Sequence, residues 1–247
     1  MSFKYKINKQ YQSHKDYIVN ISSYFNSSSH SIHKARNELK VISYEGIDTV
    51  VKSFKIPNII NKVAYTFFRS SKAKKSYEYS LKIGDVTPSP LAYIEFFNFG
   101  LLTNSYFISE EFKYDFTIRE PLLDDNFDDR EEIFKAFARF TLQLHEENIF
   151  HNDYSPGNIL IKKENDTYKF KIVDINRMKF FDLQEDDRAR NFSKLWASDD
   201  ILTVIATEYK KHYECSTSFV IQVLHYSNSN KKVKNFKKRL KGKPVND

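Results

Sequence analysis

One octapeptide, residues 151–158, constrains this chain more than any other stretch of its sequence. It reads His-Asn-Asp-Tyr-Ser-Pro-Gly-Asn, and two apolar runs follow it, the second of which ends at Asp174. The spacing supplies two carboxylates, Asp153 and Asp174, and one amide, Asn158, from a loop and the end of a strand pair. A carboxylate can accept a hydroxyl proton, while carboxylate and amide oxygens suit Mg²⁺. The pattern therefore predicts a site that joins a general base to a magnesium ion.

Composition limits the class of protein. With 247 residues, 40% of them hydrophobic, the chain can bury one large core or two small lobes. Its single cysteine excludes an intramolecular disulfide and a cysteine-based zinc cluster. The sequence shows neither a signal-peptide pattern nor an apolar run of membrane-spanning length. We therefore expect a soluble, cytoplasmic protein.

The net charge of +7 is concentrated in a basic tail, residues 231–243. This tail carries eight basic residues and no acidic one, and the rest of the chain has a net charge of −1. Val233, Phe236 and Leu240 recur in it at helical spacing, so the tail could lie peripherally on the anionic inner face of the cell membrane. A solvated, frayed terminus is the alternative. Nucleic acid is not the expected partner, because no recognition motif accompanies the charge.

The expected secondary structure passes from strands to helices along the chain. Strands are expected at 17–24, 38–44, 48–55, 91–97, 104–110, 159–162 and 168–173, and helices at 59–68, 72–83, 130–147 and through most of 186–226. A sheet with one main helix first and helices later is typical of a two-lobed α+β protein. We expect the first lobe at 1–110, the second at 111–230 and a basic tail at 231–247.

Lys52 is the expected phosphate-binding residue of the first lobe. Residues 50–52, Val-Val-Lys, match the strand from which kinases present a lysine to the phosphates of ATP. Between residues 49 and 84 there are eight basic residues and one acidic residue, Glu78, which makes Glu78 the natural partner of Lys52. The alternatives are an exposed strand lysine and a surface i,i+4 pair between Glu78 and a helix lysine.

These motifs resemble those of the protein-kinase-like superfamily, and within it the lipopolysaccharide core kinases (the Kdo/WaaP family). The similarity runs from about Arg36 to Arg177 and is strongest at residues 50–52, 87–90, 151–160 and 174–177. It implies a two-lobed kinase-like fold, with an antiparallel sheet and one helix in the N-lobe and a mostly helical C-lobe. It also implies transfer of the γ-phosphate of ATP to a sugar hydroxyl of a lipopolysaccharide core precursor, a glycolipid.

The resemblance assigns roles to individual residues. Asp153 becomes the catalytic base, Asn158 and Asp174 become the Mg²⁺ ligands, and Lys52 with Glu78 becomes the phosphate clamp.

Three departures from ordinary protein kinases bear on the acceptor. The five glycines cannot form a Gly-x-Gly-x-x-Gly loop, so phosphate contact there must come from side chains, for which Arg36 is the candidate. Asn152 replaces the arginine that reads activation-loop phosphorylation, and Ser155 replaces the lysine two residues after the base. These changes favour a glycan or small-molecule acceptor over a protein. A kinase with another acceptor and a nucleotide-binding pseudokinase scaffold are the alternatives.

Overall fold

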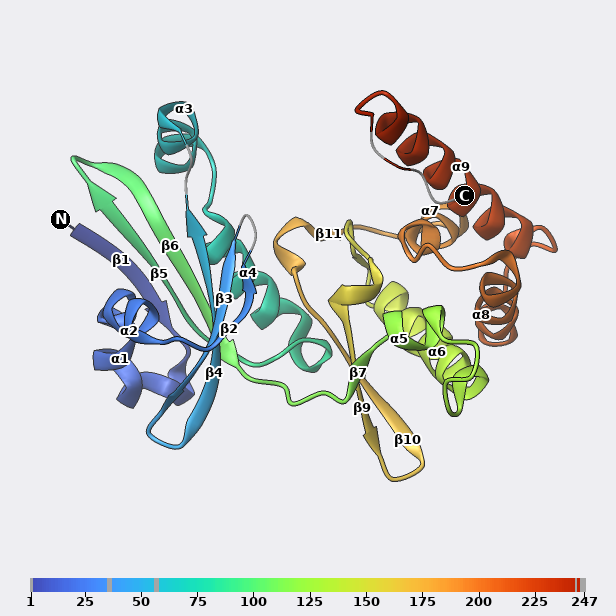
Figure 1. The fold of residues 1–247 in the computed structure, drawn as a ribbon, viewed down its shortest axis with the longest axis horizontal. Coiled ribbons are helices and arrows are strands. Elements are labelled where there is room, and N and C mark those ends of the chain that lie inside the picture. The colour runs from blue at the N-terminus through green and yellow to red at the C-terminus, as the bar shows by residue number, and fades with distance from the viewer. Residues whose placement is uncertain (1, 35–36, 56–57, 243, 245–247) are drawn as a thin grey trace. The chain divides into compact units, whose positions relative to one another are not determined.

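The computed structural model describes residues 2–34, 37–55, 58–242 and 244, and it divides into two compact units, Met1–Lys113 and Tyr114–Asp247 (Figure 1). The N-terminal unit contains a six-stranded antiparallel sheet in the order β1-β5-β6-β4-β3-β2. Its strands are β1 (Ser2–Ile7), β2 (Ser31–Lys34), β3 (Glu38–Tyr44), β4 (Ile47–Lys55), β5 (Pro90–Asn98) and β6 (Leu101–Glu110). The predicted hairpin at 38–44 and 48–55 is confirmed as β3 and β4, and the strands predicted at 91–97 and 104–110 are confirmed as β5 and β6.

Helices cover both faces of this sheet. They are η1 (Lys9–His14), α1 (Lys15–Val19), α2 (Ile21–Ser27), α3 (Ile59–Val63), the π-helical η2 (Ala64–Phe68), α4 (Lys72–Ile83) and η3 (Gly84–Val86). Tyr17 and Phe25 of α1 and α2 share a buried cluster with Val51 of β4. Tyr77 of α4 packs instead with Phe54, whose side chain points to the other face of the same strand. The sheet therefore has an α1–α2 face and an α4 face.

The strand predicted at 17–24 is wrong, because this segment forms α1 and α2. Tyr17, Ile18, Ile21 and Phe25 are all buried, and their spacing is that of one helix face. A short apolar run fits a strand and a buried helix equally well until its packing partner is known. Here the packing partner is the α1–α2 face of the sheet, which these two short helices cover.

The C-terminal unit is mainly helical. Its helices are α5 (Arg119–Leu123), α6 (Arg130–Glu146), η4 (Pro156–Asn158), η5 (Ile175–Arg177), α7 (Glu185–Asn191), η6 (Phe192–Lys194), α8 (Asp199–His212) and α9 (Phe219–Arg239). Its strands are β7 (Phe116–Thr117), β8 (Ile149–Phe150), β9 (Ile159–Glu164), β10 (Thr167–Ile172) and β11 (Lys179–Phe180), which form the sheets β10-β9-β7 and β11-β8. The predicted helix at 130–147 and the strand pair that follows the octapeptide are confirmed.

The basic tail continues helix α9 as far as Arg239. Val233, Phe236 and Leu240 are 52%, 62% and 71% exposed, so the predicted apolar edge is present on the surface of this unit. None of the helices in the described ranges has the length and hydropathy needed to cross a bilayer.

Candidate active site

The octapeptide forms a loop between β8 and β9, and the buried ring of His151 organises this loop. The backbone N–H of Asp153 donates to His151 Nδ1 over 3.1 Å, and His151 Nε2 lies 3.0 Å from the carbonyl oxygen of Val173. A carbonyl can only accept, so Nε2 carries the proton and the ring is neutral. Burial lowers the pKa of His151, which favours this neutral form. The ring thereby links the backbone of Asp153 to that of Val173, the residue before Asp174.

Asp153, Asn158 and Asp174 are brought together by this loop. Asn158 Nδ2 donates to the carbonyl oxygen of Asp153 over 2.9 Å, and the N–H of Val173 donates to the carbonyl oxygen of Asn158 over 2.9 Å. The Asn158 nitrogen is therefore engaged, and its side-chain oxygen is the atom suited to a cation. Asp174 has left-handed backbone angles (φ 59°) and accepts from Asn176 Nδ2 over 2.8 Å. The Asp153 carboxylate is 38% exposed, so a substrate can reach it.

A buried chain of hydrogen bonds supports the loop from below. Arg188 donates to the Tyr209 hydroxyl over 3.1 Å, and this hydroxyl lies 2.9 Å from His145 Nδ1. On the other side of the ring, His145 Nε2 lies 3.0 Å from Asn191 Oδ1. Asn191 Nδ2 then donates to the carbonyl oxygen of His151 over 3.0 Å. Because Oδ1 of Asn191 must accept, His145 carries its proton on Nε2 and receives one from Tyr209. Complete burial lowers the pKa of His145 to about 3, so the ring is neutral.

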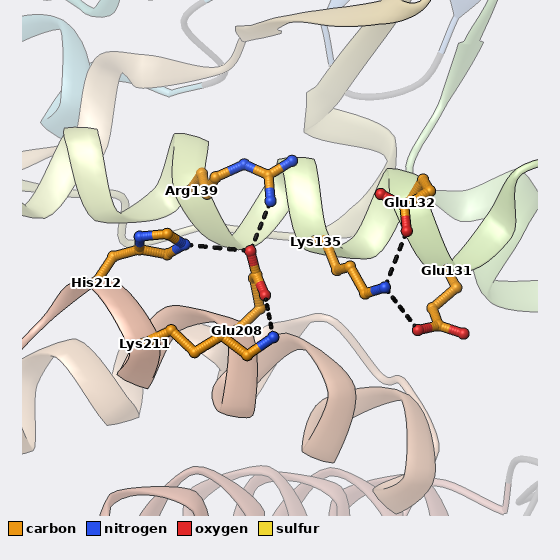
Figure 2. A network of polar contacts seen from close by, with 7 residues as sticks. All are labelled: Glu131, Glu132, Lys135, Arg139, Glu208, Lys211 and His212. Atoms are coloured by element: carbon orange, nitrogen blue, oxygen red, sulfur yellow. Dashed lines mark hydrogen bonds and ion pairs between the residues drawn. The ribbon is translucent and has the colours of Figure 1, made fainter.

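Helix α6, which delivers the chain to the loop, is fixed to α8 by the carboxylate of Glu208. This side chain is 7% exposed and lies 2.6 Å from Arg139, 2.9 Å from Lys211 and 3.2 Å from His212 (Figure 2). Hydrogen bonds from Lys211, His212 and Arg139 lower the pKa of Glu208 to about 2, although burial opposes them. The octapeptide loop is therefore reached by a helix that this cluster holds to α8, and it is itself supported by the buried chain of hydrogen bonds.

Sequence reasoning missed Lys194, which lies beside the loop, and Trp196, which follows it by two residues. Lys194 Nζ lies 3.9 Å from Asp153 Oδ1 and donates to the carbonyl oxygen of Asn152. A positive charge thus stands beside the candidate base, although Ser155 replaces the lysine that ordinary kinases carry in the loop. Trp196 has a φ of 60°, a conformation that costs a bulky residue about 1–3 kcal/mol. The one available signal was that Trp196 is the only tryptophan of the chain.

Lys52 lies in the N-terminal unit, on the α4 face of the sheet. It shares that face with Phe54 and lies opposite Phe107 of β6, and both of these rings belong to the cluster that packs against α4. Glu78 of α4 lies near the same face. Burial raises the pKa of Tyr93 on this face to about 12, and the negative charges of Glu95 and Glu78 add to the effect. Glu78 also lies 3.9 Å from Lys74, the surface pair weighed as an alternative.

Arg36 falls outside the described residues. The predicted clamp therefore stays a prediction for Lys52, Glu78 and Arg36 alike.

The site has two candidate ligands for a metal rather than a closed cage. Within the described ranges no three His, Cys, Asp or Glu side chains gather so that they could hold a metal ion. One amide and one carboxylate, Asn158 and Asp174, nevertheless fit Mg²⁺ held largely by substrate phosphates. A dedicated protein cage is not required for that chemistry.

Comparisons with known proteins agree with this geometry. The model of the lipopolysaccharide kinase (Kdo/WaaP) family matches residues 123–211, which include the octapeptide, Asp174, Lys194 and Trp196. Among solved structures, "WaaP in complex with acyl carrier protein" matches with a TM-score of 0.59 at 12% identity, over 95% of this chain and 97% of that one. Comparison with curated protein sequences gives no match. The resemblance inferred from the motifs is confirmed, and so is the protein-kinase-like fold.

Proposed function

Residues 123–211 belong to the lipopolysaccharide kinase (Kdo/WaaP) family, and from this membership we propose that the chain transfers the γ-phosphate of ATP to a sugar hydroxyl of a lipopolysaccharide core precursor. The family makes the chain an ATP-dependent kinase. The glycolipid acceptor and the residue roles that follow are part of the proposal.

Asp153 is the proposed general base. The observation that supports it best is that both peptide groups of Asp153 are held, the N–H by His151 and the carbonyl by Asn158, while its carboxylate stays partly exposed. A base must be fixed within hydrogen-bond reach of the hydroxyl proton, and this loop fixes it by short-range contacts.

Asn158 and Asp174 are the proposed ligands of Mg²⁺. Bound there with ATP, the ion would neutralise charge on the phosphate oxygens during transfer. On the protein side, His151 links the proposed base to the segment of Asp174, because its ring spans from the backbone of Asp153 to that of Val173. In the N-terminal unit, Lys52 and Glu78 are the proposed clamp on the α- and β-phosphates, together with Arg36.

Helix α9 is the proposed contact with the inner face of the cell membrane. Val233 and Phe236 in its last turns, and Leu240 directly after its end, are exposed between lysines, the pattern of a helix that lies on an anionic lipid surface. Such contact would bring the enzyme to a lipid-borne acceptor.

The test is a γ-phosphate transfer assay with Mg²⁺-ATP on extracted lipopolysaccharide precursors and on a protein mixture. The solved neighbour is a complex with acyl carrier protein, so the assay is run with and without that protein. Asp153→Asn and Asp174→Ala should each reduce transfer by at least about a thousandfold. Asp166→Asn, at an exposed hairpin turn, is the matched control and should keep normal activity.

Each outcome decides something. Near-normal turnover in Asp153→Asn or Asp174→Ala would refute the site assignment. Phosphate on protein alone would keep the site and change the acceptor. ATP binding without transfer to either acceptor would point to a pseudokinase scaffold.

A further inference from the structure

The octapeptide carries the proposed base but no positive charge of its own. Its only titratable base is His151, whose buried ring is neutral, and Ser155 stands where ordinary serine/threonine kinases carry a lysine. A phosphoryl group in transfer spreads negative charge over its oxygens, and enzymes that transfer it place lysine or arginine side chains against that charge. A cation at this point of the site has to come from another segment of the C-terminal unit.

Lys194 reaches the octapeptide from a segment 42 residues after Asn152. Its ammonium group donates to the carbonyl oxygen of Asn152 and lies 3.9 Å from Asp153 Oδ1. An ammonium group has three N–H donors, and the Asn152 carbonyl uses one of them. The side chains of Lys194 and Asp153 are 36% and 38% exposed, so a substrate that reaches the carboxylate also reaches the ammonium group.

Helix α9 braces the segment that carries Lys194. Asn230 Nδ2 donates to the carbonyl oxygen of Ser193 over 2.8 Å, and Lys231 Nζ donates to that of Ala197 over 2.7 Å. These two contacts hold the backbone on both sides of the lysine. Electrostatic catalysis depends on charges that are in place before the substrate arrives, and a braced backbone provides this placement.

We propose that Lys194 is a catalytic residue that contacts the γ-phosphate of ATP during transfer, in place of the lysine that ordinary kinases carry in the loop. The inference rests on the proposed function and adds one residue to its site. Asp153 takes the proton of the acceptor hydroxyl, and the acceptor oxygen bonds to the γ-phosphorus. The bond from this phosphorus to the β,γ-bridging oxygen breaks, and ADP leaves with the electron pair. Lys194 exchanges no proton in this step, and its charge stabilises the oxygens of the transferring group.

Removal of this charge should lower the turnover number and leave substrate binding intact. Lys194→Gln should reduce kcat about 100- to 1000-fold and change the KM for ATP and for the glycolipid by no more than about twofold, because the contact strengthens in the transition state. The matched control is Lys169→Gln, which removes the same charge from an exposed position of β10 and should keep the wild-type kcat. A kcat within about tenfold of the wild-type value, or an equal loss in the control, would overturn the proposal.

A lysine that only anchors the octapeptide through Asn152 predicts a different result in a rescue experiment. Ser155→Lys places an ammonium group where ordinary kinases carry it, and it does not restore the contact of residue 194 with the Asn152 carbonyl. The backbone of Ser155 is extended (φ −89°), a conformation open to lysine, so the variant is expected to fold. Addition of Ser155→Lys to Lys194→Gln should raise kcat at least about tenfold. No recovery would assign Lys194 to anchoring alone and overturn the catalytic role.

Failure of the proposed function gives a different pattern. If the wild-type protein transfers no phosphate to glycolipid, the proposed acceptor is wrong, and ATP hydrolysis, with water as the acceptor, carries the same comparison of Lys194→Gln with and without Ser155→Lys. Loss and recovery of hydrolysis in these variants would support the role of Lys194 independently of the glycolipid. A wild-type protein that turns over ATP with neither acceptor would overturn both proposals.

Discussion

The neutral state of His145 makes the C-terminal unit sensitive to acid. Its ring is fully buried between Tyr209 and Asn191, and burial lowers its pKa from 6.5 to about 3, helped by the charge of Arg188. Below pH 6.5 the unfolded chain binds a proton at this position that the folded chain does not bind. The free energy of unfolding must therefore fall as the pH drops from 6.5 towards 3.

The size of the effect follows from the two pKa values. Each pH unit between them costs about 1.4 kcal/mol, so His145 alone should remove about 2 kcal/mol of stability between pH 7 and pH 5. The lowered pKa of His151 acts in the same direction.

Urea unfolding at the two pH values, followed by Trp196 fluorescence, measures this loss. His145→Gln provides the comparison, because glutamine offers an acceptor and a donor but does not titrate. Any constant cost of the substitution cancels when each protein is compared with itself. The wild-type loss between pH 7 and pH 5 should exceed the His145→Gln loss by about 2 kcal/mol. Equal losses would show that His145 is not held neutral and would refute the derived direction of the hydrogen bonds.

Three further predictions concern other parts of the chain. Glu208→Gln should lower the free energy of unfolding by about 1–2 kcal/mol in urea, since it removes the carboxylate charge that Arg139, Lys211 and the His212 ring share; no change would assign the packing of α6 on α8 to apolar contacts alone. Lys40→Met should cost about 2–4 kcal/mol in thermal unfolding, because the carbonyls of two residues lose the buried ammonium that donates to them; a neutral result would mean that water replaces it. Replacing Val233, Phe236 and Leu240 with serine should weaken binding to anionic vesicles about tenfold or more in a sedimentation assay and leave ATP turnover in solution unchanged, and undiminished binding would return the tail to a solvated role.

The sequence predicts those parts of the site that are contiguous. The octapeptide carries the candidate base and its neighbouring amide on one loop, and the loop conformation depends on short-range contacts such as that of Asn158 with Asp153. The same holds for the hairpin of β3 and β4, because its turn residues and the alternation of side chains along its strands are local features of the sequence. By contrast, the strand prediction at 17–24 fails because only the tertiary partner distinguishes a buried strand from a buried helix.

The supporting residues could not be predicted in this way. Asn191 and Tyr209 contact His145 from 46 and 64 residues away, and no local motif marks either of them. Lys194 reaches the loop from a segment whose course is set by α9, through the bond between Asn230 and the carbonyl of Ser193. Such contacts depend on the packing of the whole unit, which periodicity does not encode.

The buried chain from Arg188 to His151 also constrains how this protein can diverge. Each link has a fixed direction, because every donor must meet an acceptor where no water can substitute. A lineage that exchanges Tyr209 for a residue without a hydroxyl must also replace His145, and with it the partner of Asn191. We therefore expect these positions to covary as a set among relatives, so that a collection of such sequences would record the hydrogen-bond direction as coupled substitutions.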